Sequence, residues 1–178
     1  MSKKILILSG SPRKDGNSER LCKQFMAGAE SAGHTVEMVS LREKKVAYCV
    51  ACYACRKLKK CVQKDDANEI IQKMIDADVL VLSSPVYFYS IAAQLKALID
   101  RCVSRYTEIR NKEFYYIVTA AENSITAAER TIEDMRGFVD CIDGAQERGI
   151  VYGVGAWDKG DIEGMPAMET AYEMGKNC

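Results

Sequence analysis

Short apolar runs alternate with amphipathic segments along the whole chain, and this alternation constrains the fold more strongly than any other feature. Nearly continuous apolar runs are typical of strands buried on both faces, and strands that alternate with helices form parallel sheets. Because crossovers between parallel strands are right-handed, the pattern predicts a doubly wound α/β fold with helices on both faces of one sheet. The five expected strands cover residues 3–10, 34–41, 77–84, 114–120 and 150–155.

The segments between these strands carry apolar residues three and four positions apart, as amphipathic helices do. Asn17 or Ser18 is placed to cap the first helix, and Asp65 or Asp66 is placed to cap the second. With 178 residues the chain suits one domain over residues 1–178, because two full domains would each be small. The later helices are expected over residues 91–102, 126–145 and 167–176.

Charge and hydrophobic content exclude several functional classes. The 25 basic and 25 acidic residues balance, so no overall charge attracts nucleic acid or an anionic membrane. No apolar run reaches the roughly 18 residues of a membrane-spanning helix, and the run near the N-terminus is too short for a signal peptide. We therefore expect a cytoplasmic protein without nucleic-acid or membrane partners. Thiols stay reduced in the cytoplasm, so eight cysteines indicate metal or redox chemistry rather than disulfides.

The loop after the first strand, SGSPRKDGNS, has the composition of a phosphate-binding loop. Ligands of doubly wound sheets bind beyond the carboxyl ends of the strands, where the N-terminus of the next helix offers free N–H groups to an anion. The dinucleotide fingerprint and the Walker motif are both absent, which favours a monophosphate over a pyrophosphate. A plain capped turn is the alternative. The candidate side chains are Ser9, Ser11, Arg13, Asn17 and Ser18.

The loop after the third strand, SSPVYFYS, places Pro85 before the three aromatic residues Tyr87, Phe88 and Tyr89. Backbone N–H and C=O groups in such a loop can bind a planar heterocycle while an aromatic side chain packs against its edge. Taken alone, the aromatic residues would more simply cover the start of the next helix. Together with the first loop, they indicate a flat ring with a phosphate tail, and flavin mononucleotide (FMN) is the obvious ligand of that kind.

Four cysteines fall within the segment CVACYACRKLKKC, spaced C-x2-C-x2-C-x5-C. Iron–sulfur clusters are held by four thiolates at compact spacing, whereas zinc sites with four cysteines usually use two separated pairs. The spacing therefore favours a four-iron four-sulfur cluster, with zinc and an unmetallated loop of thiols as the alternatives. The expected ligands are Cys49, Cys52, Cys55 and Cys61 in the cysteine-rich segment 49–61.

Basic residues accompany these cysteines, at positions 56–60 (RKLKK) and 42–45 (REKK). Cations beside a negatively charged cluster favour its reduced state, and they would steer an acidic electron carrier such as a ferredoxin toward it. An ordinary solvated surface is the alternative.

The single histidine, the cysteines outside the quartet and the single tryptophan say less about function. His34, the only histidine, is expected to face solvent, which argues against histidine-based catalysis and suits a reaction carried out by a cofactor. Cys22, Cys102 and Cys141 lie in helical patterns and are expected to pack as small apolar residues. Trp157 is expected to pack against the domain, with a place beside the flavin as the alternative.

Several motifs give the chain a family resemblance. It resembles the flavodoxin-like NAD(P)H-dependent FMN reductase superfamily and, within it, the iron–sulfur flavoproteins. The motifs that carry the resemblance are GSPRxxGNS (10–18), PVYF (85–88), LKALIDR (95–101), the cysteine quartet with KDD (64–66), GAWxKGDI (155–162) and AYEMGKN (171–177).

The resemblance implies a flavodoxin-like sheet of order 2-1-3-4-5, with FMN between the first and third strands. It implies a phosphate site at Ser9, Ser11, Asn17 and Ser18, within a loop that includes Pro12 and Arg13. The isoalloxazine ring would lie against the backbone of Pro85, Val86, Tyr87, Phe88 and Tyr89. Such proteins usually form homodimers or homotetramers whose contacts border the flavin.

The combined hypothesis is an FMN-dependent oxidoreductase that passes electrons between an iron–sulfur cluster and FMN to reduce a small acceptor. A cluster accepts single electrons and a flavin can collect two, so the pair would couple one-electron input to two-electron reduction. Three alternatives stay open. They are a cluster-free NAD(P)H-dependent FMN or quinone reductase, a non-catalytic flavodoxin-like carrier and a zinc-stabilised interaction module on the same fold.

Overall fold

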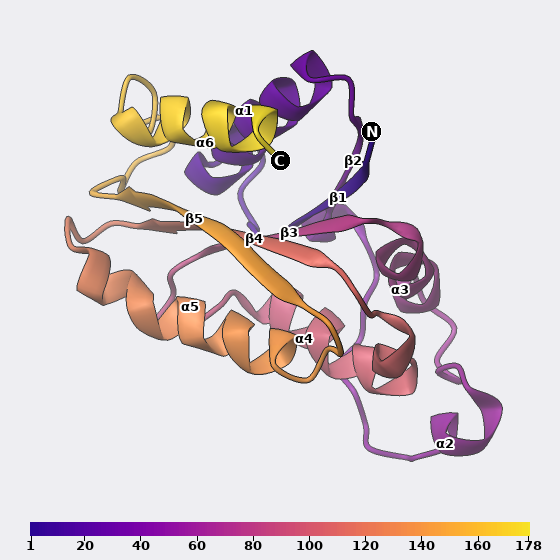
Figure 1. The fold of residues 1–178 in the computed structure, drawn as a ribbon. Helices are drawn as coiled ribbons and strands as arrows, with labels where there is room; N and C mark the ends of the chain where they lie inside the picture. The colour runs from indigo at the N-terminus through magenta and orange to yellow at the C-terminus, as the bar shows by residue number, and fades with distance from the viewer.

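A five-stranded parallel sheet forms the centre of the computed structural model, which describes residues 1–178 (Figure 1). The strand order is β2-β1-β3-β4-β5, which confirms the order expected for a flavodoxin-like fold. The strands are β1 (Lys4–Ser9), β2 (Thr35–Ser40), β3 (Val79–Pro85), β4 (Glu113–Ala120) and β5 (Gln146–Val154).

Helices cover both faces of the sheet (Figure 1). On one face lie α1 (Asn17–Ser31) and α6 (Pro166–Lys176). On the other face lie α3 (Ala67–Asp76), α4 (Ala93–Arg101) and α5 (Ile125–Val139). A four-residue helix, α2 (Cys55–Leu58), lies apart from these layers at the lower right of Figure 1. None of the helices has the length and apolar character needed to cross a membrane.

The two-sided cover explains why the strands are apolar at consecutive positions. Side chains alternate between the faces of a strand, so Ile5 and Ile7 pack in a cluster of 15 buried residues with α1 and α6. Leu6 and Leu8 point to the other face and pack in a cluster of 24 buried residues with α3, α4 and α5. Each strand that is covered on both sides must therefore be apolar throughout.

Helices α1 and α6 approach each other at glycine. A Cβ atom at Gly28 of α1 would collide with the carbonyl oxygen of Tyr172, and one at Gly175 of α6 would collide with the carbonyl oxygen of Phe25. The two backbones therefore pass with no room for side chains between them, and this contact holds α6 against the helix that follows the first loop.

Several sequence-based expectations about local structure are wrong. Helix α5 ends at Val139 rather than continuing to residue 145, because the chain turns there and Gly144 takes a left-handed conformation with φ of 68°. The N-cap of α1 is Gly16, and neither Asn17 nor Ser18 caps that helix with its side chain.

Two other residues have different surroundings from those expected. His34 is half-buried rather than solvent-facing, because its ring nitrogens lie 3.2 Å from the backbone N of Lys3 and 3.2 Å from the backbone O of Cys178. Cys141 is exposed rather than packed, since it lies beyond the end of α5. Cys22 and Cys102 are fully buried as expected, and burial raises the pKa of each thiol to about 12.

Candidate functional site

A groove lies at the carboxyl ends of β1, β3 and β4, where loops from four strands meet. The backbone N–H of Gly10 donates to the carbonyl of Ser83 at 2.8 Å, which joins the ends of β1 and β3 where the strand order reverses. The narrow part of the groove encloses about 190 Å³. It is lined by polar and small residues, among them Ser11, Arg13, Gly16, Asn17, Ser18, Thr119 and Ala156.

Asn17, predicted to hold phosphate, uses its side-chain amide to hold the loop after β5. Its Nδ2 group donates to the carbonyls of Ala156 (3.3 Å) and Asp158 (2.9 Å), and its Oδ1 accepts from the backbone N–H of Gly160 (2.9 Å). The guanidinium of Arg13 donates to the carbonyl of Trp157 at 3.1 Å. The first loop therefore fixes the loop that forms the far wall of the groove.

The serines of the first loop differ in exposure to the groove. Ser11 and Ser18 line it, and the hydroxyl of Thr119 donates to Ser18 Oγ at 3.3 Å. Ser9 and Pro12 are not among the lining residues, and Ser9 is fully buried with no hydrogen-bond partner for its hydroxyl. Thr119 was not predicted as a site residue. Its position at the end of the fourth strand could have indicated it, because strand ends border the ligand in this fold.

The second loop is a tight hairpin with a strained backbone. Tyr87 and Ser90 exchange backbone hydrogen bonds of 3.0 and 3.1 Å, and between them Phe88 and Tyr89 have φ of 50° and 61°. Bulky residues in the left-handed region cost about 1 to 3 kcal/mol each, and such strain concentrates at binding sites. The Phe88 side chain is fully exposed, so its own packing does not compensate for that strain.

The groove widens beside this hairpin into an open apolar part of about 570 Å³. Both parts share Val86, Tyr87, Ala121 and Trp157, so they form one continuous groove. Trp157 is 71% exposed and lines the groove, so the expectation that it packs against the domain is wrong. A narrow polar end at a helix N-terminus and a wide apolar end suit a phosphate with an attached flat ring, and these residues fit FMN.

A second candidate site lies on the loop that carries the cysteine quartet, here called the cysteine loop (residues 48–64). Its two ends are joined by Asp65, which accepts hydrogen bonds from the backbone N–H of Ala47 (3.0 Å) and from Arg101. Next to them, Lys45 and Asp66 form a backbone bond of 3.0 Å and a side-chain bond of 2.7 Å. The KDD motif thus closes the base of the loop.

All four cysteines of the quartet line one cavity of about 560 Å³ between the cysteine loop and the end of α4. Thiolates are the donors that iron–sulfur clusters and zinc require, so the donor set fits such a group. No three side chains that could bind metal are grouped tightly enough to hold a single ion. Ala51, Tyr53 and Lys59 have left-handed φ values of 50°, 57° and 54°, which marks this loop as a second strained segment. Cys141 also lines the cavity.

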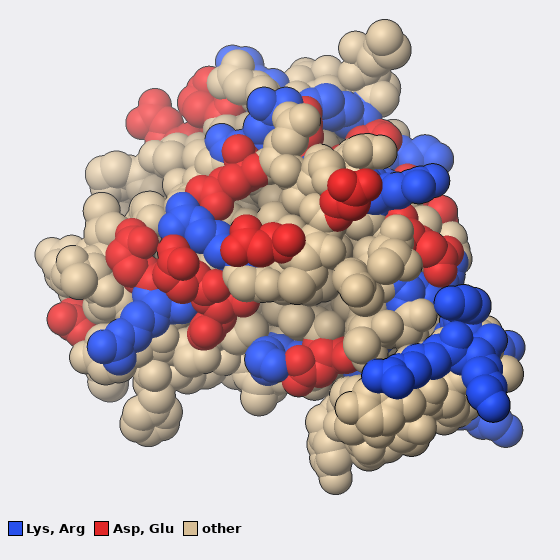
Figure 2. Space-filling model, turned by 60° about the horizontal axis from the view of Figure 1, so that its bottom comes forward, with Lys and Arg blue, Asp and Glu red and all other residues tan.

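Basic side chains gather on the outer surface of the cysteine loop. Arg56, Lys57, Lys59 and Lys60 are exposed, and the Arg56 guanidinium lies 4.2 Å from the centre of the Tyr53 ring. Figure 2 shows Lys and Arg concentrated on the projecting lower right of the molecule, where α2 lies in Figure 1. The expected basic surface is therefore present.

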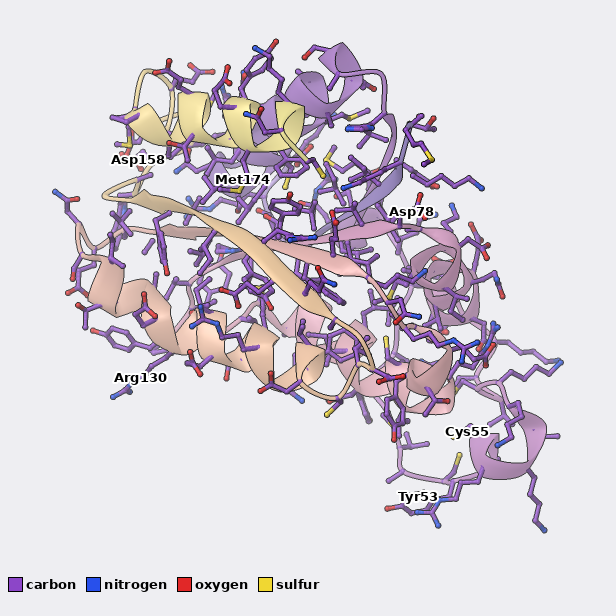
Figure 3. All side chains as sticks on the ribbon, in the orientation of Figure 1. Tyr53, Cys55, Asp78, Arg130, Asp158 and Met174 are labelled. Carbon is purple, nitrogen blue, oxygen red and sulfur yellow. The ribbon has the colours of Figure 1, made fainter.

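The two candidate sites lie on different sides of one chain. Figure 3 places Cys55 and Tyr53 at the lower right, whereas Asp158 and Arg130, which contact residues of the groove, lie at the left. Asp158 is held by Asn17, and the Arg130 guanidinium lies 5.8 Å from the centre of the Tyr89 ring. The body of the sheet and α5 separates the two sites.

A doubly wound parallel sheet with a mononucleotide groove at its switch point defines the flavodoxin-like class of proteins. Residues 3–147 match the model of the NADPH-dependent FMN reductase family, and the chain belongs to that family. Its members are FMN-dependent oxidoreductases.

Several curated relatives are named iron-sulfur flavoproteins, a more specific name than that of the family. An iron-sulfur flavoprotein of Methanocaldococcus jannaschii is 35% identical over 137 residues, covering 76% of this chain and 70% of the relative. An iron-sulfur flavoprotein of Methanosarcina thermophila is 40% identical over 125 residues, covering 70% of this chain and 61% of the relative.

Solved structures confirm the fold. An NAD(P)H:quinone oxidoreductase from Methanothermobacter marburgensis superposes with a TM-score of 0.76 at 19% identity and covers 99% of both chains. An azoreductase from Bacillus anthracis superposes with a TM-score of 0.79 at 17% identity and covers both chains completely.

Proposed function

We propose that this protein binds FMN in the groove and an iron–sulfur cluster in the cysteine loop, and that it passes electrons between them to reduce a small acceptor. The observation that carries the proposal is the convergence of all four quartet cysteines on one cavity in a loop whose base is closed. The names of the curated relatives support it. When bound, the cluster supplies single electrons and the flavin supplies two-electron chemistry.

The chain's own residues would bind and orient the flavin. The N-terminus of α1, with Ser11, Ser18 and Arg13, would hold the phosphate at the narrow end. Asn17 would hold the loop at residues 156–160, which forms the wall of the groove, in place. Buried Ser9 and Pro12 would shape the turn between β1 and α1. The backbone of residues 85–89 would border the ring, and the aromatic side chains with Trp157 would limit the access of water.

Cys49, Cys52, Cys55 and Cys61 would be the cluster ligands. Their loop would need only local adjustment, because its ends are already joined and the thiols already face one cavity. We expect the protein to work in the cytoplasm, where the eight cysteines stay reduced.

The separation of the two sites within one chain supports a homodimer or homotetramer (Figure 3). In such an assembly the cysteine loop of one chain would lie beside the groove of another, so that electrons would cross a subunit contact. The exposed aromatic residues Tyr53, Tyr87, Phe88 and Trp157 belong to the two sites that would meet there.

The basic surface of the cysteine loop would receive an acidic electron carrier such as a ferredoxin. Reversing Lys57, Lys59 and Lys60 to Glu should slow reduction by ferredoxin, and the loss should be largest at low salt, where charge steering is strongest. The matched control reverses Lys4, Lys96 and Lys176, which are also exposed but lie outside the cysteine loop and the groove. Equal rates and equal salt dependence for all three proteins would exclude docking at this surface.

The decisive experiment is anaerobic purification followed by a visible spectrum and assays of iron, sulfide and zinc. We expect flavin absorbance with added broad absorbance, and about four irons per chain. Stoichiometric zinc without iron would refute the proposed cluster. A second candidate is a cluster-free NAD(P)H-dependent FMN or quinone reductase, which the family model and the ungrouped thiols favour. Rapid bleaching of the flavin by NADPH in protein without iron would support it.

A further inference from the structure

Arg101, at the end of α4, is a fully buried cation that lines the cavity of the cysteine quartet. We propose that Arg101 is a positioning residue, which closes the cysteine loop through Asp65 and donates its Nε–H to sulfur at Cys61. The donation to sulfur rests on the proposed function, whereas the closure of the loop does not.

The closure depends on three hydrogen bonds from one guanidinium. Nη1 donates to the carbonyl of Ala47 at 2.8 Å and to Asp65 Oδ2 at 2.7 Å, and Nη2 donates to Asp65 Oδ1 at 2.9 Å. Ala47 comes directly before the cysteine loop and Asp65 directly after it, so Arg101 contacts both ends. A planar guanidinium can bind a carboxylate with two parallel bonds, which a lysine cannot do.

These three bonds leave two of the five N–H groups of the guanidinium without a protein partner, the Nε–H and the second N–H of Nη2. The Nε group is buried and makes no hydrogen bond with the protein, although burying an unpaired charged donor is costly. Cys61 and Arg101 line the same cavity, and although burial lowers the pKa of the guanidinium, Asp65 and Cys61 raise it. An anionic sulfur at Cys61 would give this donor the partner that it lacks.

Asp65 neutralises the buried charge of Arg101 in protein without a cluster. Burial alone would raise the pKa of Asp65, but the hydrogen bonds from Arg101, Ala47 and Ala67 outweigh it and lower that pKa. The pair is therefore ionised at neutral pH. Arg101 can then hold Asp65 with its two terminal nitrogens and still direct Nε–H toward sulfur.

Two measurable effects follow. Hydrogen bonds to cluster sulfur raise a reduction potential, and residues that orient metal ligands contribute about 10- to 100-fold to metal affinity. Arg101 should thus influence both the potential of the cluster and its retention without touching iron.

The test uses Arg101→Lys and Arg101→Gln in the full chain, with Arg105→Gln as the matched control. Arg105 lies four residues further on and bonds Glu108 and Gln72, and it is not among the residues that line the cavity. Hydrogen exchange in iron-free protein reports closure of residues 48–64. Anaerobic reconstitution then gives the midpoint potential and the rate of iron loss to a chelator.

We expect Arg101→Gln to accelerate exchange in the cysteine loop and to lose iron about 10- to 100-fold faster, while Arg105→Gln behaves as wild type. Arg101→Lys keeps the charge but has no Nε–H, so its cluster potential should shift to a more negative value. It also supplies the test if Arg101→Gln fails to fold.

Three results separate the possible failures. Wild-type protein that binds no iron on reconstitution would refute the proposed function together with the donation to sulfur. Wild-type protein that holds a cluster, with Arg101→Lys unchanged in potential and in iron loss, would overturn the role of Arg101 alone. Unchanged exchange in iron-free Arg101→Gln would overturn the closure of the loop.

Discussion

Replacing Asn17 with Ala should destabilise the protein even when no flavin is bound. The Asn17 amide makes three hydrogen bonds to the backbone of residues 156–160, and Asn17 is 8% exposed. Each such bond contributes about 1 kcal/mol net, so the three together should contribute about 3 kcal/mol. For a domain of this size that loss corresponds to a fall of roughly 6 to 12 °C in melting temperature.

Thermal unfolding of flavin-free protein measures this effect directly. Gln24→Ala, a change of similar size further along α1, is the control and should behave as wild type. Asn17→Asp should also destabilise, because a carboxylate oxygen would then face the carbonyls of Ala156 and Asp158. If Asn17 acted only as a phosphate ligand, Asn17→Ala would weaken FMN binding and leave the flavin-free melting temperature unchanged. That result would refute the reasoning.

Three further predictions concern other parts of the molecule. Phe88→Gly should stabilise the flavin-free protein by about 1 kcal/mol in a denaturant titration, because glycine adopts positive φ without strain and Phe88 is fully exposed. An unchanged free energy of unfolding would show that the hairpin is unstrained. Gly28→Ala should destabilise by about 1 to 3 kcal/mol in the same assay, since its Cβ meets the carbonyl of Tyr172, whereas Ala at exposed Gly137 should not destabilise. Asp65→Asn should lower the free energy of unfolding at pH 7. The difference from wild type should vanish as pH falls below 3.8, the usual pKa of the carboxyl group, and then through the lower pKa that Asp65 has in the folded protein. A difference that persists in acid would contradict the ion pair.

Much of the fold follows from local patterns. The apolar runs at β1, β3 and β4 are visible in the sequence because these strands are covered on both faces. The strand order was available only through the resemblance, since no local pattern states which strands are neighbours. The end of α5 was missed because the apolar residues continue to Ile142 and Ala145 after the helix has ended.

The site residues were harder to interpret, because one residue type serves several purposes. Asn17 and Ser18 line the groove, but the sequence could not reveal that the Asn17 amide is directed at a loop 139 to 143 positions later in the chain. The partners of His34 also depend on contacts between distant segments, because its ring lies beside Lys3 and Cys178. The strain at Phe88 and Tyr89 was hidden, since nothing in the residue types indicates positive φ.

The glycine contact between α1 and α6 has a consequence for how the protein is made. The loop at residues 156–160 forms one wall of the groove, and α6 packs against α1. This loop and α6 are both translated after all five strands. A nascent chain on the ribosome would therefore present its first loop long before the loop's wall and support exist. Flavin capture would have to wait until residues 156–176 have left the ribosome, so the five strands and the first loop alone should not retain the cofactor.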